Sequence, residues 1–206
     1  MIIKQYIAGP IDANNYLVAD EASKEAVLID CSDRVQKIIG DVKNLGLNVK
    51  YILFTHGHFD HVMGANVMKE ELGAKVLGSK EDLNQTELTK TILQSMGLPL
   101  VEDPKYDEFI DKNSQLKIGD TEIKVIETPG HTEGGLCFLI ENNLFSGDTL
   151  FKGCVGRTDL PGGSFAKLEN SIKNKLYKLD DLINVHPGHG DMTTIYYEKK
   201  YNEIVR

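Results

Sequence analysis

The segment Thr55–His61, THGHFDH, constrains the fold of this chain more than any other stretch. It places three imidazoles and one carboxylate within six residues, directly after the apolar run 51–54. Buried neutral histidines need hydrogen-bond partners, and protonated histidines this close together repel each other. A divalent cation removes both costs, because neutral imidazole is a common metal ligand. The segment therefore predicts a metal-binding loop whose first two histidines face one side and Asp60 and His61 the other, which suits two adjacent metals.

Three further strand ends carry histidine or aspartate beside glycine. They are Thr128–Thr132 (TPGHT), Ser146–Thr149 (SGDT) and His186–Gly190 (HPGHG). Functional groups collect where strands meet loops, and glycine lets the backbone turn closely there. Each motif alone is a common turn, but with Thr55–His61 the four sites use every histidine of the chain. They predict one shared metal centre.

Apolar periodicity alternates between strand and helix along the chain. The expected strands are 2–7, 15–18, 26–30, 51–55, 74–77, 122–127, 136–140, 144–146 and 182–185. The expected helices are 34–45, 63–72, 81–96, 165–179 and 194–205, and a loop rich in Gly and Pro spans 153–164. This alternation predicts helices packed on sheets, an α/β (α+β) fold, in a single domain over residues 1–206.

Composition sets limits on function. The net charge of −8 disfavours nucleic-acid binding, which needs basic surface to neutralise phosphates. No apolar stretch approaches the eighteen or so residues of a membrane span, and the N-terminus lacks the pattern of a signal peptide. The three cysteines (Cys31, Cys137 and Cys154) are odd in number and widely spaced, which is unlike a disulfide framework. We expect a cytoplasmic protein that acts on a small-molecule substrate, without nucleic-acid or membrane partners; the oligomeric state is left open.

The HGHFDH motif, with His131, Asp148 and His189 at these intervals, resembles the metallo-β-lactamase superfamily over essentially the whole chain. Within it, the stretch Leu144–Gly163 is similar to the glyoxalase II-like (hydroxyacylglutathione hydrolase-like) enzymes of the short bacterial kind. The resemblance implies a four-layer αβ/βα sandwich with metals at one edge of its two sheets. It also implies a binuclear metallo-hydrolase that cleaves a small acyl thioester, S-D-lactoylglutathione or a conjugate of another small thiol.

The resemblance further implies seven ligands around two divalent metal ions. They are His56, His58 and His131 for the first metal, Asp60, His61 and His189 for the second, and Asp148 as the bridge. Zinc is the expected metal, with iron or manganese as alternatives. Two such metals hold a hydroxide between them, lower the pKa of its parent water to about 7, and polarise the substrate carbonyl. Asp60 is also a candidate to orient that hydroxide.

Several other residues have both a functional and a structural interpretation. Asp30 resembles a carboxylate that supports the metal loop, or it caps a turn. Arg157 is a candidate to bind a substrate carboxylate, or it pairs with Asp159 at the surface. Lys152 is a second candidate for substrate binding. His186 is surplus to the ligand set, and we interpret it as a nearby or structural histidine.

Two other functions fit the same motifs. The first is a persulfide dioxygenase on the same fold, which would bind one iron through His56, His131 and Asp148, a facial triad. The second is a non-catalytic metal-binding module, but structural zinc sites are closed and four-coordinate, and this ligand set is larger. Long glyoxalase II enzymes carry a C-terminal helical domain that contacts glutathione. This chain has one helix after its last motif, so we expect a more open substrate site and leave the thiol carrier open.

Overall fold

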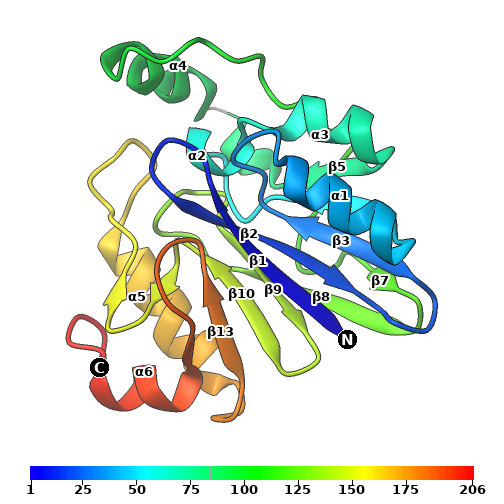
Figure 1. The fold of residues 1–206 in the computed structure, drawn as a ribbon. Helices are drawn as coiled ribbons and strands as arrows, with labels where there is room; N and C mark the ends of the chain where they lie inside the picture. Colours follow the sequence, from blue (N-terminus) through cyan, green and yellow to red (C-terminus); the bar gives the residue numbers. More distant parts are fainter. Residues whose placement is uncertain (84) are drawn as a thin grey trace.

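A computed structural model describes residues 1–83 and 85–206, without the side chains of residues 86 and 87. Two six-stranded β-sheets lie face to face (Figure 1). The first contains, in spatial order, β1 (Ile2–Ala8), β2 (Ala13–Ala19), β3 (Glu25–Ile29), β4 (Asn48–Leu53), β5 (Lys75–Gly78) and β6 (Glu108–Phe109). The second contains β14 (Thr193–Thr194), β13 (Asn184–Pro187), β10 (Asn143–Gly147), β9 (Leu136–Ile140), β8 (Thr121–Glu127) and β7 (Leu116–Ile118). A small separate sheet pairs β11 (Leu150–Phe151) with β12 (Cys154–Val155).

Helices cover the outer face of each sheet. The first sheet packs against α1 (Gln36–Leu45) and α3 (Ala65–Leu72), and the second against α5 (Phe165–Asn174) and α6 (Ile195–Tyr201). The remaining helical segments are α2 (Phe59–Val62), α4 (Gln85–Ser95), η1 (Lys80–Asp82) and η2 (Leu176–Lys178). This helix–sheet–sheet–helix order confirms the four-layer αβ/βα sandwich predicted from the sequence. Among the helices of the described residues, none combines the length and the apolar content needed to cross a bilayer.

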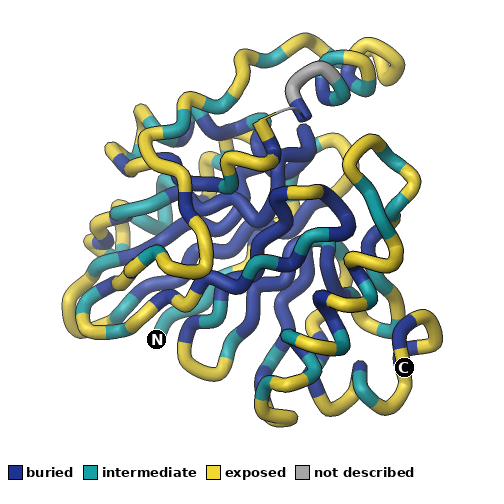
Figure 2. Tube along the Cα trace, turned by 180° about the vertical axis from the view of Figure 1, so that it is seen from behind, coloured by how far each residue is buried: buried dark blue, intermediate teal, exposed yellow. Residues whose placement is uncertain are grey.

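Strands that are apolar on both faces explain why three hydrophobic layers form. Successive strand residues point to opposite faces of a sheet. In β2, Leu17 therefore packs beneath α1 and α3, while its neighbour Tyr16 enters the layer between the sheets. In β9, Phe138 enters that middle layer and Cys137 packs on the α5 side. Figure 2 shows the result, with buried strands running through the centre of the molecule.

Strand direction brings the loops with the sequence motifs to one end of the sandwich. In the first sheet β3 is parallel to β4. In the second, β10 is parallel to β13, and β8 has the same direction as β10 because both are antiparallel to β9. The carboxyl ends of parallel strands lie at the same edge of a sheet. The loops after β3, β4, β8, β10 and β13 therefore gather there, and Leu136 N donates to Thr55 O (2.7 Å) across the two sheets.

Some element boundaries differ from the sequence prediction. The expected helix 165–179 is divided at Lys175, where the backbone leaves helical geometry (φ −121°, ψ −61°) and the side chain donates to Glu127 O at 2.6 Å. The expected helix 81–96 is split into η1 and α4, and residue 84 lies outside the described residues. The last long strand begins two residues later than expected, and the short strands β6 and β7 were not predicted.

Candidate metal centre

The structure brings all seven predicted ligands together where the two sheets meet. They come from the loop after β4 (His56, His58), from α2 (Asp60, His61), and from the loops after β8 (His131), β10 (Asp148) and β13 (His189). Three trios each have their ligand atoms within 4.8 Å of one another: His56–His58–His131, His56–His61–Asp148 and Asp60–His61–His189. The first and third trios are the two ligand sets that the sequence resemblance implied.

Several of these side chains present buried atoms that no described residue satisfies. They are Nε2 of His56, His58, His61 and His131, and Oδ1 of Asp148. A buried polar atom without a partner costs about 1–3 kcal/mol, so a cluster of such atoms needs a compensating ligand. Imidazole nitrogen and carboxylate oxygen are donors that divalent cations accept. The donor set therefore fits metal ions.

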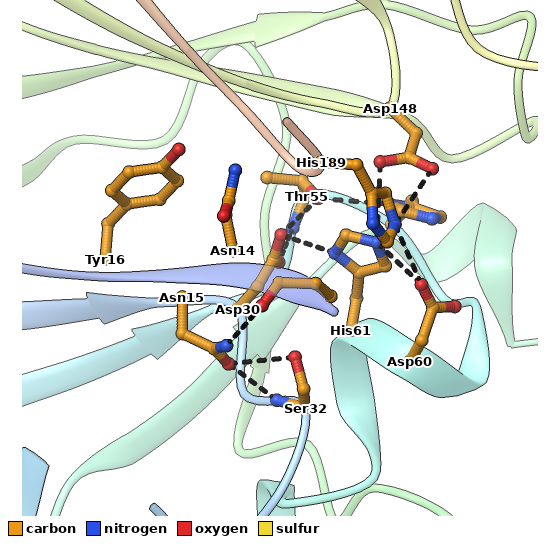
Figure 3. Close-up of polar contacts among 12 residues, drawn as sticks. Asn14, Asn15, Tyr16, Asp30, Ser32, Thr55, Asp60, His61, Asp148 and His189 are labelled. Carbon is orange, nitrogen blue, oxygen red and sulfur yellow. Dashed lines mark hydrogen bonds and ion pairs between the residues drawn. The ribbon is translucent and has the colours of Figure 1, made fainter. Parts of the chain in front are cut away.

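Asp30, at the end of β3, supports ligands of more than one trio (Figure 3). Its Oδ2 lies 2.8 Å from His61 Nδ1 and accepts from Thr55 Oγ1 at 2.8 Å, while its Oδ1 accepts from Thr55 N at 2.8 Å. Thr55 Oγ1 in turn lies 3.0 Å from His56 Nδ1. A partner at Nδ1 fixes the ring and leaves Nε2 for a metal. Asp30 therefore contacts the segment that carries the predicted ligands, which a residue that only caps a turn would not do.

Asp148 and Asp60 lie between the histidines. Asp148 Oδ1 is 3.4 Å from His61 Nε2, and its Oδ2 is 3.6 Å from His131 Nε2 and 3.7 Å from His189 Nε2. Asp148 thus faces ligands of both the first and the third trio, as a bridging carboxylate must. Asp60 Oδ2 lies 3.1 Å from His189 Nε2 and 3.2 Å from His61 Nε2.

Burial and neighbouring charge set the protonation of the imidazoles. Burial lowers the pKa of His56 well below its usual value and that of His58 to about 3, and the adjacent histidines add repulsion. Burial alone would also lower the pKa of His61, but nearby carboxylates, Asp60 foremost, raise it well above its usual value. Neutral imidazole is the ligating form, so His56 and His58 are ready to bind at neutral pH. At His61 the carboxylates attract a positive charge, which a metal ion supplies when it binds.

The two predicted substrate-binding residues are paired with acids. Arg157 Nε and Nη2 donate to the two carboxylate oxygens of Asp159, both at 2.8 Å, which is the surface pairing that the sequence had left open. The backbone oxygen of Arg157 accepts from His131 Nδ1 at 2.7 Å, so its main chain orients a ligand. Lys152 Nζ lies 3.1 Å from Asp191 Oδ2.

His186 lies outside all three trios. Its ring stacks on Phe145 with centroids 4.8 Å apart and an interplanar angle of 17°. Its Nε2 lies 3.0 Å from Asn143 Oδ1, and burial lowers its pKa to about 4. These contacts are those of a histidine that packs within the sheet layer.

Residues that the sequence analysis did not single out hold the loops in place. Asn14 Nδ2 donates to Pro187 O (2.9 Å) and Gly190 O (3.0 Å), and Tyr16 OH donates to Pro187 O (2.8 Å), so β2 braces the loop after β13. Asp82 joins two other ligand loops. Such contacts join residues far apart in the chain, and no local pattern signals them.

Fold and site together define a class: an αβ/βα sandwich with a histidine–aspartate centre suited to divalent metal ions. The sequence profile of the Metallo-beta-lactamase superfamily matches residues 8–195. The chain therefore belongs to this superfamily, whose members are mostly hydrolases.

Several relatives match nearly the whole chain, among them the following two. An uncharacterized protein of Aquifex aeolicus is 41% identical and covers 98% of this chain and 96% of its own length. The hydroxyacylglutathione hydrolase GloC of Haemophilus influenzae is 36% identical over 93% of this chain and 92% of its own length, which supports the glyoxalase II-like resemblance.

Solved structures repeat the fold. BLEG-1 B3 metallo-beta-lactamase has a TM-score of 0.88 at 31% identity and covers 99% of both chains. TTHA1623 in a di-iron-bound form has a TM-score of 0.86 at 34% identity over 98% of this chain and 100% of its own. ETHE1 from Myxococcus xanthus has a TM-score of 0.80 at 27% identity over 98% and 84%.

Proposed function

We propose that this protein is a binuclear metal-dependent hydrolase that cleaves a small acyl thioester, in the manner of glyoxalase II-like enzymes. The observation that carries the proposal is the pair of trios His56–His58–His131 and Asp60–His61–His189, with Asp148 facing both. A single cation would use one trio and leave buried ligand atoms of the other without a partner. Two cations would use both, and Asp148 would then be the residue available to both.

Two divalent cations, when bound, would supply an activated water and polarise a carbonyl oxygen. The surrounding residues supply orientation. Asp60 is almost fully buried, and its pKa is held low because His61 and His189 outweigh the effect of burial, so it stays a carboxylate. We propose that it accepts a hydrogen bond from the attacking water. A thioester suits such a site, because thiolate is a good leaving group and needs little help from a general acid.

Similarity to GloC supports a hydroxyacyl thioester as the substrate class, since that relative is named a hydroxyacylglutathione hydrolase. Zinc is the metal we propose first, because the ligands are imidazoles and carboxylates. Iron is the alternative, and the structure of TTHA1623 is described in a di-iron-bound form. We also propose that the protein acts in the cytoplasm on a small molecule.

A persulfide dioxygenase with one iron is the second candidate. Its two-histidine, one-carboxylate set would be His56, His131 and Asp148. His131 Nε2 lies 3.6 Å from Asp148 Oδ2, and His56 shares a trio with Asp148, so these side chains are assembled as well. We rank the hydrolase first because the Asp60–His61–His189 trio could hold a second cation and because GloC, at 36% identity, is named a hydrolase.

The deciding experiment measures metal content and turnover on the same sample. We expect about two metal ions per chain and hydrolysis of acyl thioesters, with S-D-lactoylglutathione in a panel of conjugates of other small thiols. Two bound metals without any thioester hydrolysis would indicate another hydrolase substrate. One iron per chain, with oxygen uptake in the presence of glutathione persulfide, would replace the hydrolase by the dioxygenase.

A further inference from the structure

We infer that Asp82 is a positioning residue that holds the His56–His58–His131 trio in its ligating geometry. The inference rests on the proposed metal centre but not on any particular substrate. Asp82 is the last residue of η1 and is only 4% exposed. The sequence analysis predicted a helix over this segment and assigned Asp82 no function. Its carboxylate lies between the loop after β4 and the loop after β8, which carry all three histidines of the trio.

Both carboxylate oxygens of Asp82 are used by these two loops. Oδ2 accepts from Gly57 N at 2.8 Å and from Thr132 Oγ1 at 2.8 Å, and Oδ1 accepts from Gly134 N at 2.6 Å. Gly57 stands between His56 and His58, and Thr132 directly follows the third histidine of the trio. One side chain therefore fixes the loops within one residue of every ligand in the trio.

Close packing makes this contact specific. A Cβ added at Gly57 would lie 2.9 Å from both Cβ and the backbone oxygen of Asp82, and one at Gly134 would lie 2.6 Å from its carboxylate. Glycine at both positions lets the two backbones approach the acid. The rings of His58 and His131, which these loops carry, stand 4.5 Å apart between centroids and at 90°.

The support from Asp82 is separate from that of Asp30. Asp30 contacts His61, and His56 through Thr55, but among the described residues it makes no hydrogen bond to the loop after β8. Asp82 spans the two sheets, because η1 follows β5 of the first sheet and Thr132 follows β8 of the second. Bracing partners of this kind typically contribute a factor of about 10–100 in metal affinity.

The test is the zinc affinity of the Asp82→Asn protein, measured by competition with a chromophoric chelator. Asparagine keeps the shape but replaces one acceptor oxygen by an NH₂ group that faces another donor. We expect affinity to fall by about 10- to 100-fold. Asp107→Asn is the matched control and should bind as the unmodified protein does, because Asp107 also accepts a backbone N–H (Val76 N, 2.8 Å) but lies against Lys69, outside the trios.

A milder pair of variants covers the case in which Asp82→Asn does not fold. Thr132→Val removes one of the three donors and should weaken zinc binding, whereas Thr132→Ser keeps the hydroxyl and should restore it. Unchanged affinity in Thr132→Val, or equal loss in both Thr132 variants, would overturn the inference.

Combining Asp82→Asn with a substitution in either trio shows which trio Asp82 supports. In a His189→Ala protein, which loses a ligand of the Asp60–His61–His189 trio but keeps the His56–His58–His131 trio, Asp82→Asn should still weaken zinc binding. In a His58→Ala protein it should have no further effect, because coupled residues are not additive. Equal losses in both backgrounds would refute a role specific to this trio. Failure of the unmodified protein to bind any divalent metal would overturn the metal centre itself, which separates the two proposals.

Discussion

At the level of single residues, the candidate ligands were predictable, whereas of the residues that support them the sequence indicated only Asp30. The ligands His56, His61 and Asp148 stand out because metal binding depends on side-chain type and on short spacing, both visible in a sequence. The support of these ligands depends on which donors the fold brings to them. Asp82 meets its donors only after two sheets have packed, and His131 is oriented by the backbone oxygen of Arg157, which any residue type offers.

Replacing Asp30 with Asn tests the support of the metal loop. Asp30 has φ +58°, a conformation that Asn tolerates well, so the backbone should be kept. The amide loses one acceptor for His61 and Thr55. We expect metal affinity to fall by about 10- to 100-fold and stability by about 1–3 kcal/mol. Chelator competition and chemical unfolding measure the two effects, with the exposed Asp33→Asn as control; equal behaviour of the two variants would refute the role.

His186 predicts a specific dependence of stability on pH. Burial lowers its pKa from 6.5 to about 4. Between pH 4 and pH 6.5, His186 is therefore protonated in the unfolded chain and neutral in the folded chain. Stability contributed by His186 is therefore complete above pH 6.5 and is lost as pH falls toward 4, by up to about 1.4 kcal/mol per unit. His186→Gln should remove this slope in urea unfolding of metal-free protein. Parallel curves for the two proteins would contradict the prediction.

At the level of elements, long periodic segments were predicted well and short or broken ones were not. The run of apolar residues Leu168, Ile172 and Leu176 continues with helical spacing through the break at Lys175, so the pattern cannot report where the helix ends. The strands β6 and β7 contain two and three residues, and they form through pairing with neighbours rather than through local preference. The sequence analysis also missed α2, because a helix of four residues is too short to show an apolar period.

The loop after β13 carries a glycine that the centre requires. A Cβ at Gly188 would lie 2.2 Å from Asp148 Oδ1 and 2.8 Å from His61 Cε1. Gly188→Ala should therefore displace the bridging carboxylate and reduce bound metal and turnover at least tenfold. We expect the loss to appear in metal content by elemental analysis as well as in kinetics.

Gly40→Ala is the matched control for that variant. Gly40 lies within α1 with no atom in the way of an added Cβ, so alanine should stabilise the helix by about 0.5–1 kcal/mol and leave metal content unchanged. Full metal loading of Gly188→Ala would show that the loop can yield and that the close approach is not required.

At the scale of the whole molecule, the centre joins the two sheets. His56, His58, Asp60 and His61 belong to the first sheet's loops, and His131, Asp148 and His189 to the second's. The sequence predicted both halves and the four-layer arrangement through its resemblance to a known superfamily; periodicity alone gave helices on sheets. Periodicity could not predict the order in which the strands pair, because that order is set by contacts between residues far apart in the chain.

Removal of the metals should therefore weaken the entire fold rather than the site alone. Each bound ion adds about 1.4 kcal/mol of stability for every tenfold excess of free metal over its dissociation constant. We expect chelation with EDTA to abolish turnover and to lower the melting temperature, with recovery of both on adding Zn²⁺. A melting temperature independent of metal would indicate that the two halves hold together without the centre.

Asp60 and His189 lie 129 residues apart in the chain and 3.1 Å apart in space. A nascent polypeptide leaving the ribosome cannot complete the Asp60–His61–His189 trio until the segment with His189 has emerged. The loop with Asp60 and His61 must therefore wait, during the synthesis of those 129 residues, for the third member of its trio.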